Sequence, residues 1–551
     1  MRLYIQLTII CFISLSKLNS QNTVGVITYQ DKDASYEGYN LIFPHYQPDA
    51  FLLNKCGEIV HQWNGPEGYR NHNTCYILEN GDLIRALRKD EGFAFIWEDI
   101  GENLIECVTW DNELNWSFEY LDTTSRIHHD IEPTPYGTVF LISWDHHSVE
   151  EAIASGRDVS LMSQDAFSPD KIIEYDPELD SIIWEWKAWD HLVQDRDSNK
   201  PNYGVIKDHP HRININWENN QGRADWMHVN SIDYNPILDQ IMINVPTFNE
   251  IWIIDHSTTT EEAKGSSGGN SGKGGDIIWR WGNPQAYNRG AEEDQKLFFQ
   301  HDALWALDYL PTTQEDFGNI SVFNNQTEPG HSSIGMISPV FDSIAYQYTL
   351  SIDSTFLPEN FYFEWSHPEP NIISSSGLSS IQVLPNNNKL ITSGRNGITV
   401  ELSQDEKIIW QYKTPFKNGQ RVAQGTELAV NDNLTFRMRR YPIDYPGFDN
   451  HSLYPIEYLE LNPDKTFCDR LLPTINVEPD LIEVSSLSAI ELLVNNQTNK
   501  SYQAKLISLT GKTIGSLTLE QGITSHDISH LAQGCYALVV SGLNSQLFVK
   551  M

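Results

Sequence analysis

Short segments of alternating apolar and polar residues, separated by turn residues, run along most of the chain and predict β-strands. One kind of segment ends in tryptophan or another aromatic residue. It recurs at 59–65, 114–120, 182–188, 277–283, 361–367 and 408–414. Most of these six segments follow an acidic or glycine-containing turn, so each is predicted to be the second strand of a β-hairpin.

A second kind of hairpin, with Asn-Gly or similar turns, alternates with the first. These hairpins begin near His72, His128, His228, His301 and Gly377. Two hairpins make a four-stranded sheet, and six such sheets joined by insertions of irregular length are typical of a six-bladed β-propeller. A pair of β-sandwiches is the alternative, but the regular alternation of two hairpin types favours the propeller. The fold class expected is therefore all-β.

The two ends of the chain differ from this body. Residues 1–20 place Arg2 before an apolar run and predict a signal peptide, with the propeller following over 21–471. Residues 472–551 consist of short alternating strands and predict a small C-terminal β-sandwich. No later stretch approaches the roughly 20 apolar residues of a membrane-spanning helix. We therefore expect export through the periplasm, to the medium or to the cell surface.

Composition narrows the classes of function. The 551 residues exceed what one core of about 250–300 residues supports, which agrees with a repeat-built body and a second domain. With 37 basic and 74 acidic residues, the net charge of −37 argues against nucleic-acid partners. Five of the six cysteines lie after the signal segment. They allow at most two disulfides and show no metal-binding spacing.

Histidines stand at the start of several inner hairpins, which a propeller brings together near its axis. The positions are His72, His128, His129, His228 and His301. Clustered neutral imidazoles have two chemical uses: they ligate a transition metal, or one acts as a nucleophile while its neighbours donate hydrogen bonds to a group in transit. The residues alone leave this choice open.

Seven segments resemble the bacterial arylsulfate sulfotransferases, a family of six-bladed propellers. They include AFLLNKCGEIVHQW, HHDIEPTPYG, DWMHVNSIDYNP, GNSGKGGDIIWRWGNPQAY and QHDALW, in family order over 38–448. The resemblance implies sulfuryl transfer from a phenolic sulfate ester to another phenol, without a nucleotide donor, cofactor or metal. It also implies that His301 becomes a sulfohistidine and that His129 and His228 support it.

One departure from the family concerns an arginine after the second supporting histidine. Pro246 and Thr247 stand where it would fall. We expect substitutes or additional substrate contacts among other basic residues, namely His72, His128, Arg88, Arg395 and Arg437. The missing arginine leaves open an altered substrate class or a ligand-binding propeller without turnover. A metal-dependent hydrolase or lyase that uses the same histidines is a further alternative.

The last eighty residues resemble the C-terminal sorting domain of type IX secretion substrates in Bacteroidota. The resemblance rests on LISLTGKTIGSL, GITSHDISHLAQGCYALVV and the ending QLFVKM. It implies that the secretion machinery is a partner and that the protein is released or attached to the surface afterwards. A plain adhesion sandwich is the alternative for this segment.

Overall fold

The structure is a computed structural model of the 551-residue chain. It describes residues 22–29, 31, 33–89, 103–351, 355–466, 468, 482–487, 491–496, 500–508, 512–532, 534–540 and 546–550. The signal segment predicted at 1–20 lies outside these residues. The chain divides into two compact units, Met1–Cys468 and Asp469–Met551, which are described separately.

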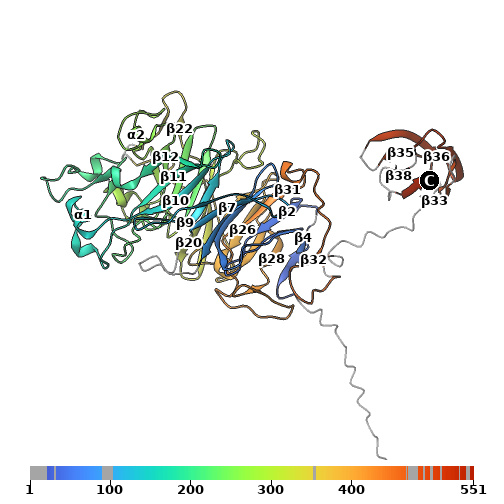
Figure 1. Cartoon of the computed structure of the whole chain (residues 1–551), viewed down its shortest axis with the longest axis horizontal. Helices are drawn as coiled ribbons and strands as arrows, with labels where there is room; N and C mark the ends of the chain where they lie inside the picture. The colour runs from blue at the N-terminus through green and yellow to red at the C-terminus, as the bar shows by residue number, and fades with distance from the viewer. Residues whose placement is uncertain are drawn as a thin grey trace, which may run out of the picture. The chain divides into compact units, whose positions relative to one another are not determined.

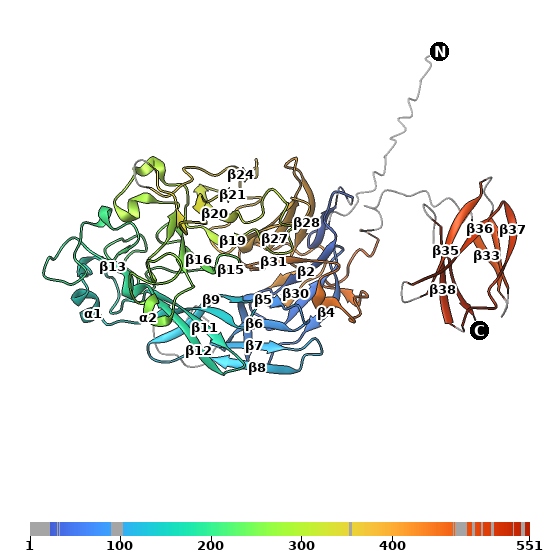
Figure 2. The same cartoon turned by 90° about the horizontal axis from the view of Figure 1, so that it is seen from above.

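Within the described residues, the strands of the first unit form six antiparallel sheets, or blades (Figures 1 and 2). Blade 1 is β5 (Tyr69–Ile77), β6 (Leu83–Lys89), β7 (Leu104–Val108) and β8 (Leu114–Glu119). Blade 2 is β9 (Ser125–Pro133), β10 (Val139–Asp145), β11 (Asp170–Asp176) and β12 (Ser181–Lys187). Blade 3 is β15 (Ser231–Asn235), β16 (Gln240–Val245), β17 (Glu250–Asp255) and β18 (Trp279–Trp281).

The remaining blades follow in the same way. Blade 4 is β19 (His301–Trp305), β20 (Ile320–Glu328), β21 (His331–Ile337) and β24 (Phe363–Ser366). Blade 5 is β25 (Ser380–Val383), β26 (Lys389–Ser393), β27 (Ile398–Leu402) and β28 (Ile408–Lys413), with β1 (Gly25–Tyr29) added at its edge. Blade 6 is β31 (Met438–Pro442), β2 (Gly38–Ile42), β3 (Ala50–Leu53), β4 (Glu58–Trp63) and β32 (Glu457–Tyr458).

The blades follow one another around a central axis. The innermost strands contact each other in the order β5, β9, β15, β19, β25, β31. Figure 2 labels β5, β9, β15, β19 and β31 toward the middle of the unit. Blade 6 in turn packs against blade 1, where the Ile77 amide donates to the Tyr441 hydroxyl at 2.9 Å. The chain therefore forms the six-bladed propeller that the sequence predicts.

The ring closes through strands from opposite ends of the propeller sequence. Strand β31 pairs with β2, with Gly38 opposite Pro442, and β1 pairs with β28. A disulfide between Cys56 and Cys468 also joins segments separated by 412 residues. Among the described cysteines, Cys75 and Cys107 are free thiols.

The six aromatic segments of the sequence coincide with the fourth strands of the six blades, counted outward from the axis, as the repeat predicts. Most of their tryptophans are buried, and some bond to a backbone carbonyl outside their own blade's strands. The indole of Trp186 donates to the Gly275 carbonyl at 2.7 Å, and that of Trp410 donates to the Lys55 carbonyl at 2.9 Å. A large apolar ring with one polar atom suits this position between sheets.

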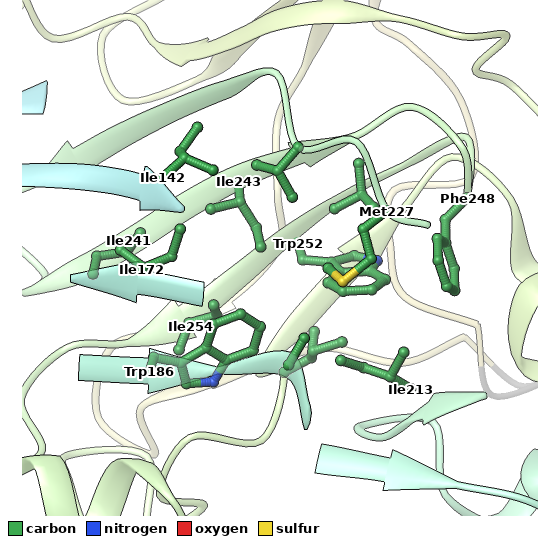
Figure 3. Close-up of a cluster of buried hydrophobic side chains, with 14 of the residues drawn as sticks. Ile142, Ile172, Trp186, Ile213, Met227, Ile241, Ile243, Phe248, Trp252 and Ile254 are labelled. Carbon is green, nitrogen blue, oxygen red and sulfur yellow. The ribbon is translucent and has the colours of Figure 1, made fainter. Parts of the chain in front are cut away.

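Branched aliphatic and aromatic side chains fill the spaces between blades. Figure 3 shows part of the cluster between blades 2 and 3. Its labelled members are Ile142, Ile172, Trp186, Ile213, Met227, Ile241, Ile243, Phe248, Trp252 and Ile254. This packing holds the inner strands in place, and those strands carry the candidate site.

The insertions between strands contain short elements. The helices are α1 (Val149–Ala154) and α2 (Thr260–Ala263), each with a capping box at its N-terminus. The 3₁₀ turns are η1 (Val159–Leu161), η2 (Ala188–His191), η3 (Ile206–Asp208), η4 (Pro284–Tyr287), η5 (Glu292–Asp294), η6 (Gly394–Asn396) and η7 (Pro446–Phe448). Short strand pairs are β13 (Leu192–Val193) with β14 (Ile213–Asn214), β22 (Phe341–Asp342) with β23 (Gln347–Tyr348), and β29 (Phe416–Lys417) with β30 (Gln420–Arg421).

The second unit consists of two antiparallel sheets in its described part, as expected for a small sandwich. One contains β33 (Ile482–Leu487), β34 (Glu491–Asn496) and β37 (Gly522–Asp527). The other contains β35 (Tyr502–Ser508), β36 (Thr513–Leu519), β38 (Gly534–Val540) and β39 (Gln546–Lys550). No helix among the described residues of either unit is long and apolar enough to cross a membrane.

Candidate active site

Three of the predicted histidines come together from blades 2, 3 and 4. His129 lies on β9, His228 just before β15, and His301 at the start of β19. The ring centroids of His129 and His228 are 4.6 Å apart. Positive charge on His228 contributes to lowering the pKa of His301, so these two rings are near enough to interact electrostatically.

Irregular backbone at these positions aims the side chains. The register of strand pairing shifts where β9 pairs with β10, and again after His301 where β19 pairs with β20. The backbone angle φ is positive at His129 (62°), His228 (54°) and Asp302 (57°). A bulge with a left-handed residue breaks the strict alternation of strand faces. Neighbouring residues in the sequence can therefore contact each other, as His128 and His129 do.

His301 is buried, and its surroundings fix one protonation state. Its Nδ1 lies 2.8 Å from Oδ1 of Asn325. The Asn325 amide nitrogen donates to the carbonyls of Ser375 (2.9 Å) and Leu378 (3.0 Å), so Oδ1 is the atom that faces the imidazole. His301 must donate from Nδ1, which leaves the lone pair on Nε2. Burial is the main cause that lowers the pKa of His301 to about 3, so the ring is neutral at ordinary pH.

His228 has the opposite tendency. Its Nδ1 bonds to a carboxylate oxygen of Asp225, and the Trp144 indole donates to the other oxygen at 2.8 Å. Burial lowers the pKa of His228, but the charge of Asp225 and the hydrogen bond outweigh burial, and the net shift is upward. This imidazole therefore favours the protonated, hydrogen-bond-donating form.

His128 lies behind His129 and has both ring nitrogens engaged. Nε2 is 2.7 Å from Oδ1 of Asp170, and Nδ1 is 2.8 Å from Nδ1 of His129. The side chains of His128 and Asp170 are both fully buried, and the His128 ring stacks on Trp144. Burial raises the pKa of Asp170, and His128 opposes that shift. Both ring nitrogens of His128 are thus engaged within the protein, and its predicted contact with substrate stays a prediction.

Arg437, just before β31, is held by two carboxylates. Its guanidinium donates to Asp130 on β9 at 2.6 and 3.0 Å and to Asp302 on β19 at 2.5 Å. It also donates to the hydroxyl of Tyr76 on β5. Since both carboxylates are fully buried, this arginine joins the inner strands of three blades to blade 6, and its charge is already balanced.

Arg395, in η6 of blade 5, is different. Among the described residues its guanidinium has no carboxylate partner and hydrogen bonds to Oδ1 of Asn431 at 3.0 Å. Its Nε is buried without a hydrogen-bond partner. Its charge also contributes to lowering the pKa of His301. An uncompensated guanidinium near a neutral imidazole is suited to bind an anion.

The remaining predicted positions are Arg88, His72 and the place of the absent family arginine. Arg88 is buried on β6, the second strand of blade 1. His72 lies on β5, but its side chain is outside the part of the chain that the structure describes. At the position of the absent family arginine, the Thr247 hydroxyl donates to the carbonyls of Trp226 (2.7 Å) and Met227 (2.8 Å). Thr247 therefore supports the backbone that leads into His228.

The sequence reasoning missed Asp170, Asp225 and Asn325. Asp225 precedes His228 by three residues within DWMH, a spacing that could have suggested the pair. Asp170 and Asn325 lie 42 and 24 residues from their histidines, on other strands of the same blades, and no local signal marks them. Within the described residues, no group of three His, Cys, Asp or Glu side chains is arranged to hold a metal ion.

Comparison with solved structures gives distant similarities. A protein of unknown function from Bacteroides caccae is 10% identical, with 68% of this chain and 93% of that chain covered and a TM-score of 0.36. Virginiamycin B lyase from Staphylococcus aureus is 10% identical, with coverage of 72% and 90% and a TM-score of 0.31. A streptogramin B lyase is 9% identical, with coverage of 77% and 99% and a TM-score of 0.32. Similarities at this level carry no functional argument.

Comparison at the level of sequence is more informative. No curated protein matches the chain. The model of the arylsulfotransferase (ASST) family, however, matches residues 94–415. This range is more than half of the 551 residues and includes His129, His228, His301, Asn325 and Arg395. The chain therefore belongs to the arylsulfotransferase (ASST) family.

Proposed function

We propose that the propeller transfers a sulfuryl group from an aryl sulfate to a phenolic acceptor through a sulfohistidine at His301, without a nucleotide donor. Family membership supports the reaction class. The observation that carries the residue assignment is the state of His301, which is neutral and has its Nε2 lone pair free of the bond to Asn325. A buried neutral imidazole is an effective nucleophile.

The reaction has two half-steps that balance. Nε2 of His301 attacks sulfur, an N–S bond forms, the S–O(aryl) bond breaks, and the departing phenolate takes a proton from the imidazole pair His129 and His228. In the second half, the acceptor hydroxyl returns a proton to the pair as its oxygen attacks sulfur and the N–S bond breaks. Sulfuryl transfer resembles phosphoryl transfer, in which positioning and donors to the equatorial oxygens supply most of the catalysis.

Arg395 is the residue that we propose in place of the absent family arginine. Its charge has no described carboxylate partner and acts on His301, whereas Arg437 is paired with Asp130 and Asp302. A guanidinium near the sulfuryl oxygens would stabilise the charge that develops on them.

The direct test is the intact mass of the mature protein after brief exposure to 4-nitrophenyl sulfate, with nitrophenol release followed in parallel. We expect one added SO₃ group, located on a peptide containing His301, and a burst of nitrophenol. His301→Ala should show neither. The matched control His367→Ala, a partly exposed histidine just after β24 of blade 4, should behave as the native chain does. Full transfer activity in His301→Ala would disprove the assignment.

The two alternatives give other outcomes. A binding propeller would retain an aryl sulfate in equilibrium dialysis, without an adduct or phenol release. A metal-dependent hydrolase or lyase would lose activity on dialysis against a chelator and recover it with added Zn²⁺ or Ca²⁺. The transferase predicts that chelator leaves the nitrophenol burst unchanged.

We also propose that the protein is exported and that residues 472–551 are a type IX sorting domain. The pattern of residues 1–20 and the C-terminal motifs support this, as does the Cys56–Cys468 disulfide, because disulfides persist mainly in oxidising compartments. Mass spectrometry of the native protein from its source should find a mature N-terminus near residue 21. Deletion of 472–551 should leave the protein in the periplasm, and normal secretion of that variant would contradict the proposal.

A further inference from the structure

Behind His129 lies a buried, hydrogen-bonded row of side chains. It runs from Asp170 on β11 through His128 to His129 on β9, with heavy-atom distances of 2.7 and 2.8 Å. The second oxygen of Asp170 accepts the backbone amide of Val229 at 3.2 Å, so the carboxylate is held from two sides. Burying a carboxylate costs desolvation free energy, which hydrogen bonds only offset. A buried carboxylate held in this way is therefore expected to have a role in folding or in chemistry.

Donor and acceptor rules restrict where the protons can be. The Asp170 carboxylate only accepts, so His128 donates to it from Nε2. The two facing Nδ1 atoms must then share one proton, since two protons would clash and none would leave two lone pairs opposed. With these two protons both rings are neutral. A third proton has one remaining place, Nε2 of His129.

The negative charge of Asp170 favours that third proton. We infer that Asp170 and His128 are positioning residues that keep His129 as an imidazolium whose Nε2–H is directed to the transferring group. This inference rests on the proposed sulfuryl transfer. It assigns His128 and Asp170 a part in proton delivery that differs from substrate contact.

The proton balance of the two half-reactions follows. The phenolate takes the Nε2 proton of His129 as the S–O(aryl) bond breaks, and the His128–His129 pair becomes neutral. The acceptor phenol returns one proton to the same nitrogen as the N–S bond to His301 breaks. Charged or titratable groups that the described structure places near this row include Asp225, His228 and Arg223. Asp130, the residue after His129, is paired with Arg437, and Arg395 acts on the neighbouring His301.

The pair formed by Asp225 and His228 favours a second protonated imidazole beside His129. Asp225 backs His228 as Asp170 backs His128, and the His129 and His228 rings are 4.6 Å apart. Two carboxylates behind three imidazoles permit His129 and His228 to be charged together. Burial is the main cause that lowers the pKa of His301, and charge on His228 contributes to the same shift, which favours the neutral form that the nucleophile needs.

The leaving-group dependence of the first half-reaction tests the relay. Phenyl sulfate needs a proton on its departing oxygen, whereas 4-nitrophenyl sulfate needs little help, so Asp170→Asn should slow the former by about 10²-fold and the latter by about tenfold or less. His128→Gln keeps a donor to Asp170 and an acceptor for His129 but cannot carry the charge. It should shift the ratio of the two rates in the same direction.

A matched control and an independent signal complete the test. Asp276→Asn removes the carboxylate of another buried pair, with His191 at 2.8 Å, and should leave the rate ratio unchanged. Histidine ¹⁵N NMR of the native chain, with His129→Gln for assignment, should show a protonated His129 that becomes neutral in Asp170→Asn.

Two results would overturn the relay: a neutral His129 in the native chain near pH 7, or equal rate losses for the two donors in both Asp170→Asn and His128→Gln. Absence of phenol release from the native chain would count against the proposed function instead. In that case the NMR signal still decides the protonation of His129.

Discussion

The chemistry of single residues here depends on partners that are not their sequence neighbours. Asn325 is the clearest example, because its amide nitrogen is fixed by two carbonyls and its oxygen therefore dictates the tautomer of His301. Asn230 is similarly fixed, donating to the Gln300 carbonyl at 3.0 Å and accepting from Asn244 at 2.6 Å. A side-chain amide fixed in this way presents a known donor or acceptor to its neighbour, as Asn325 does to His301.

Removing the Asn325 amide should free His301 to place its proton on either nitrogen. We expect Asn325→Ala to slow formation of the sulfohistidine by about tenfold, the value of one neutral hydrogen bond. The rate of the nitrophenol burst measures this. Gln326→Ala, the next residue on β20 and more exposed, is the control and should keep the native rate. An unchanged burst in Asn325→Ala would show that the tautomer is set in another way.

At the scale of elements, each inner strand joins its neighbour through polar side chains as well as through apolar packing. Asp130 on β9 accepts the amide of Ile232 on β15 at 3.1 Å, and Ser231 on β15 accepts the amide of Ala303 on β19 at 3.1 Å. Arg437 then links β9 and β19 from the blade 6 side. The bulged strands are thus fixed relative to one another, which preserves the distances between the site histidines.

A polar link between blades 3 and 2, centred on His256, makes the stability of the fold depend on pH. His256, just after β17, bonds to Asp239 at 2.6 Å and to Glu174 of β11 in blade 2 at 3.2 Å. Burial lowers the pKa of His256, but these two carboxylates outweigh burial and raise it to about 9. The folded chain therefore holds this proton more tightly than the unfolded chain, whose histidine titrates near 6.5.

The resulting stabilisation is fully present below about pH 6.5 and is lost as the pH rises through about 9. Its size is about 3 kcal/mol in the free energy of unfolding. Urea unfolding at pH 6 and pH 10 measures it, and His256→Gln should remove this part of the difference. His367→Gln, at a partly exposed position, should not. A native chain with equal stability at both pH values would contradict this prediction.

Much at this scale could be predicted from the sequence, because the repeat itself records it. The aromatic segments mark the fourth strands, and the Asn-Gly hairpins mark the first two, since each blade repeats the same burial and turn requirements. The group formed by His129, His228 and His301 follows from their equivalent places in three blades. Asp170 and Asn325 could not be found in this way, because pairing across a blade brings them to their histidines and no spacing encodes that contact.

At the scale of the whole molecule, the propeller is secured where its ends meet. The Cys56–Cys468 disulfide joins the edge of blade 6 to the last described residue of the first unit. We expect Cys56→Ser to lower the free energy of unfolding by about 2–4 kcal/mol, because the cross-link restricts the unfolded chain.

Thermal unfolding with and without dithiothreitol measures the contribution of this cross-link. Reductant should lower the Tm of the native chain and leave that of Cys56→Ser unchanged. Cys107→Ser removes a free thiol, so this variant should still respond to reductant. A native Tm that does not respond would contradict the prediction.

Ring closure by β31 also links catalysis to the completeness of the chain. Strands β2, β3 and β4 are made early, yet blade 6 lacks its innermost strand until residues 438–442 arrive. Arg437, directly before that strand, forms ion pairs with both Asp130 and Asp302, next to His129 and His301. A nascent or truncated copy would hold two unbalanced carboxylates beside the histidines and an open sixth blade. The complete site described here therefore forms only after the chain has been synthesised through β31, the last innermost strand.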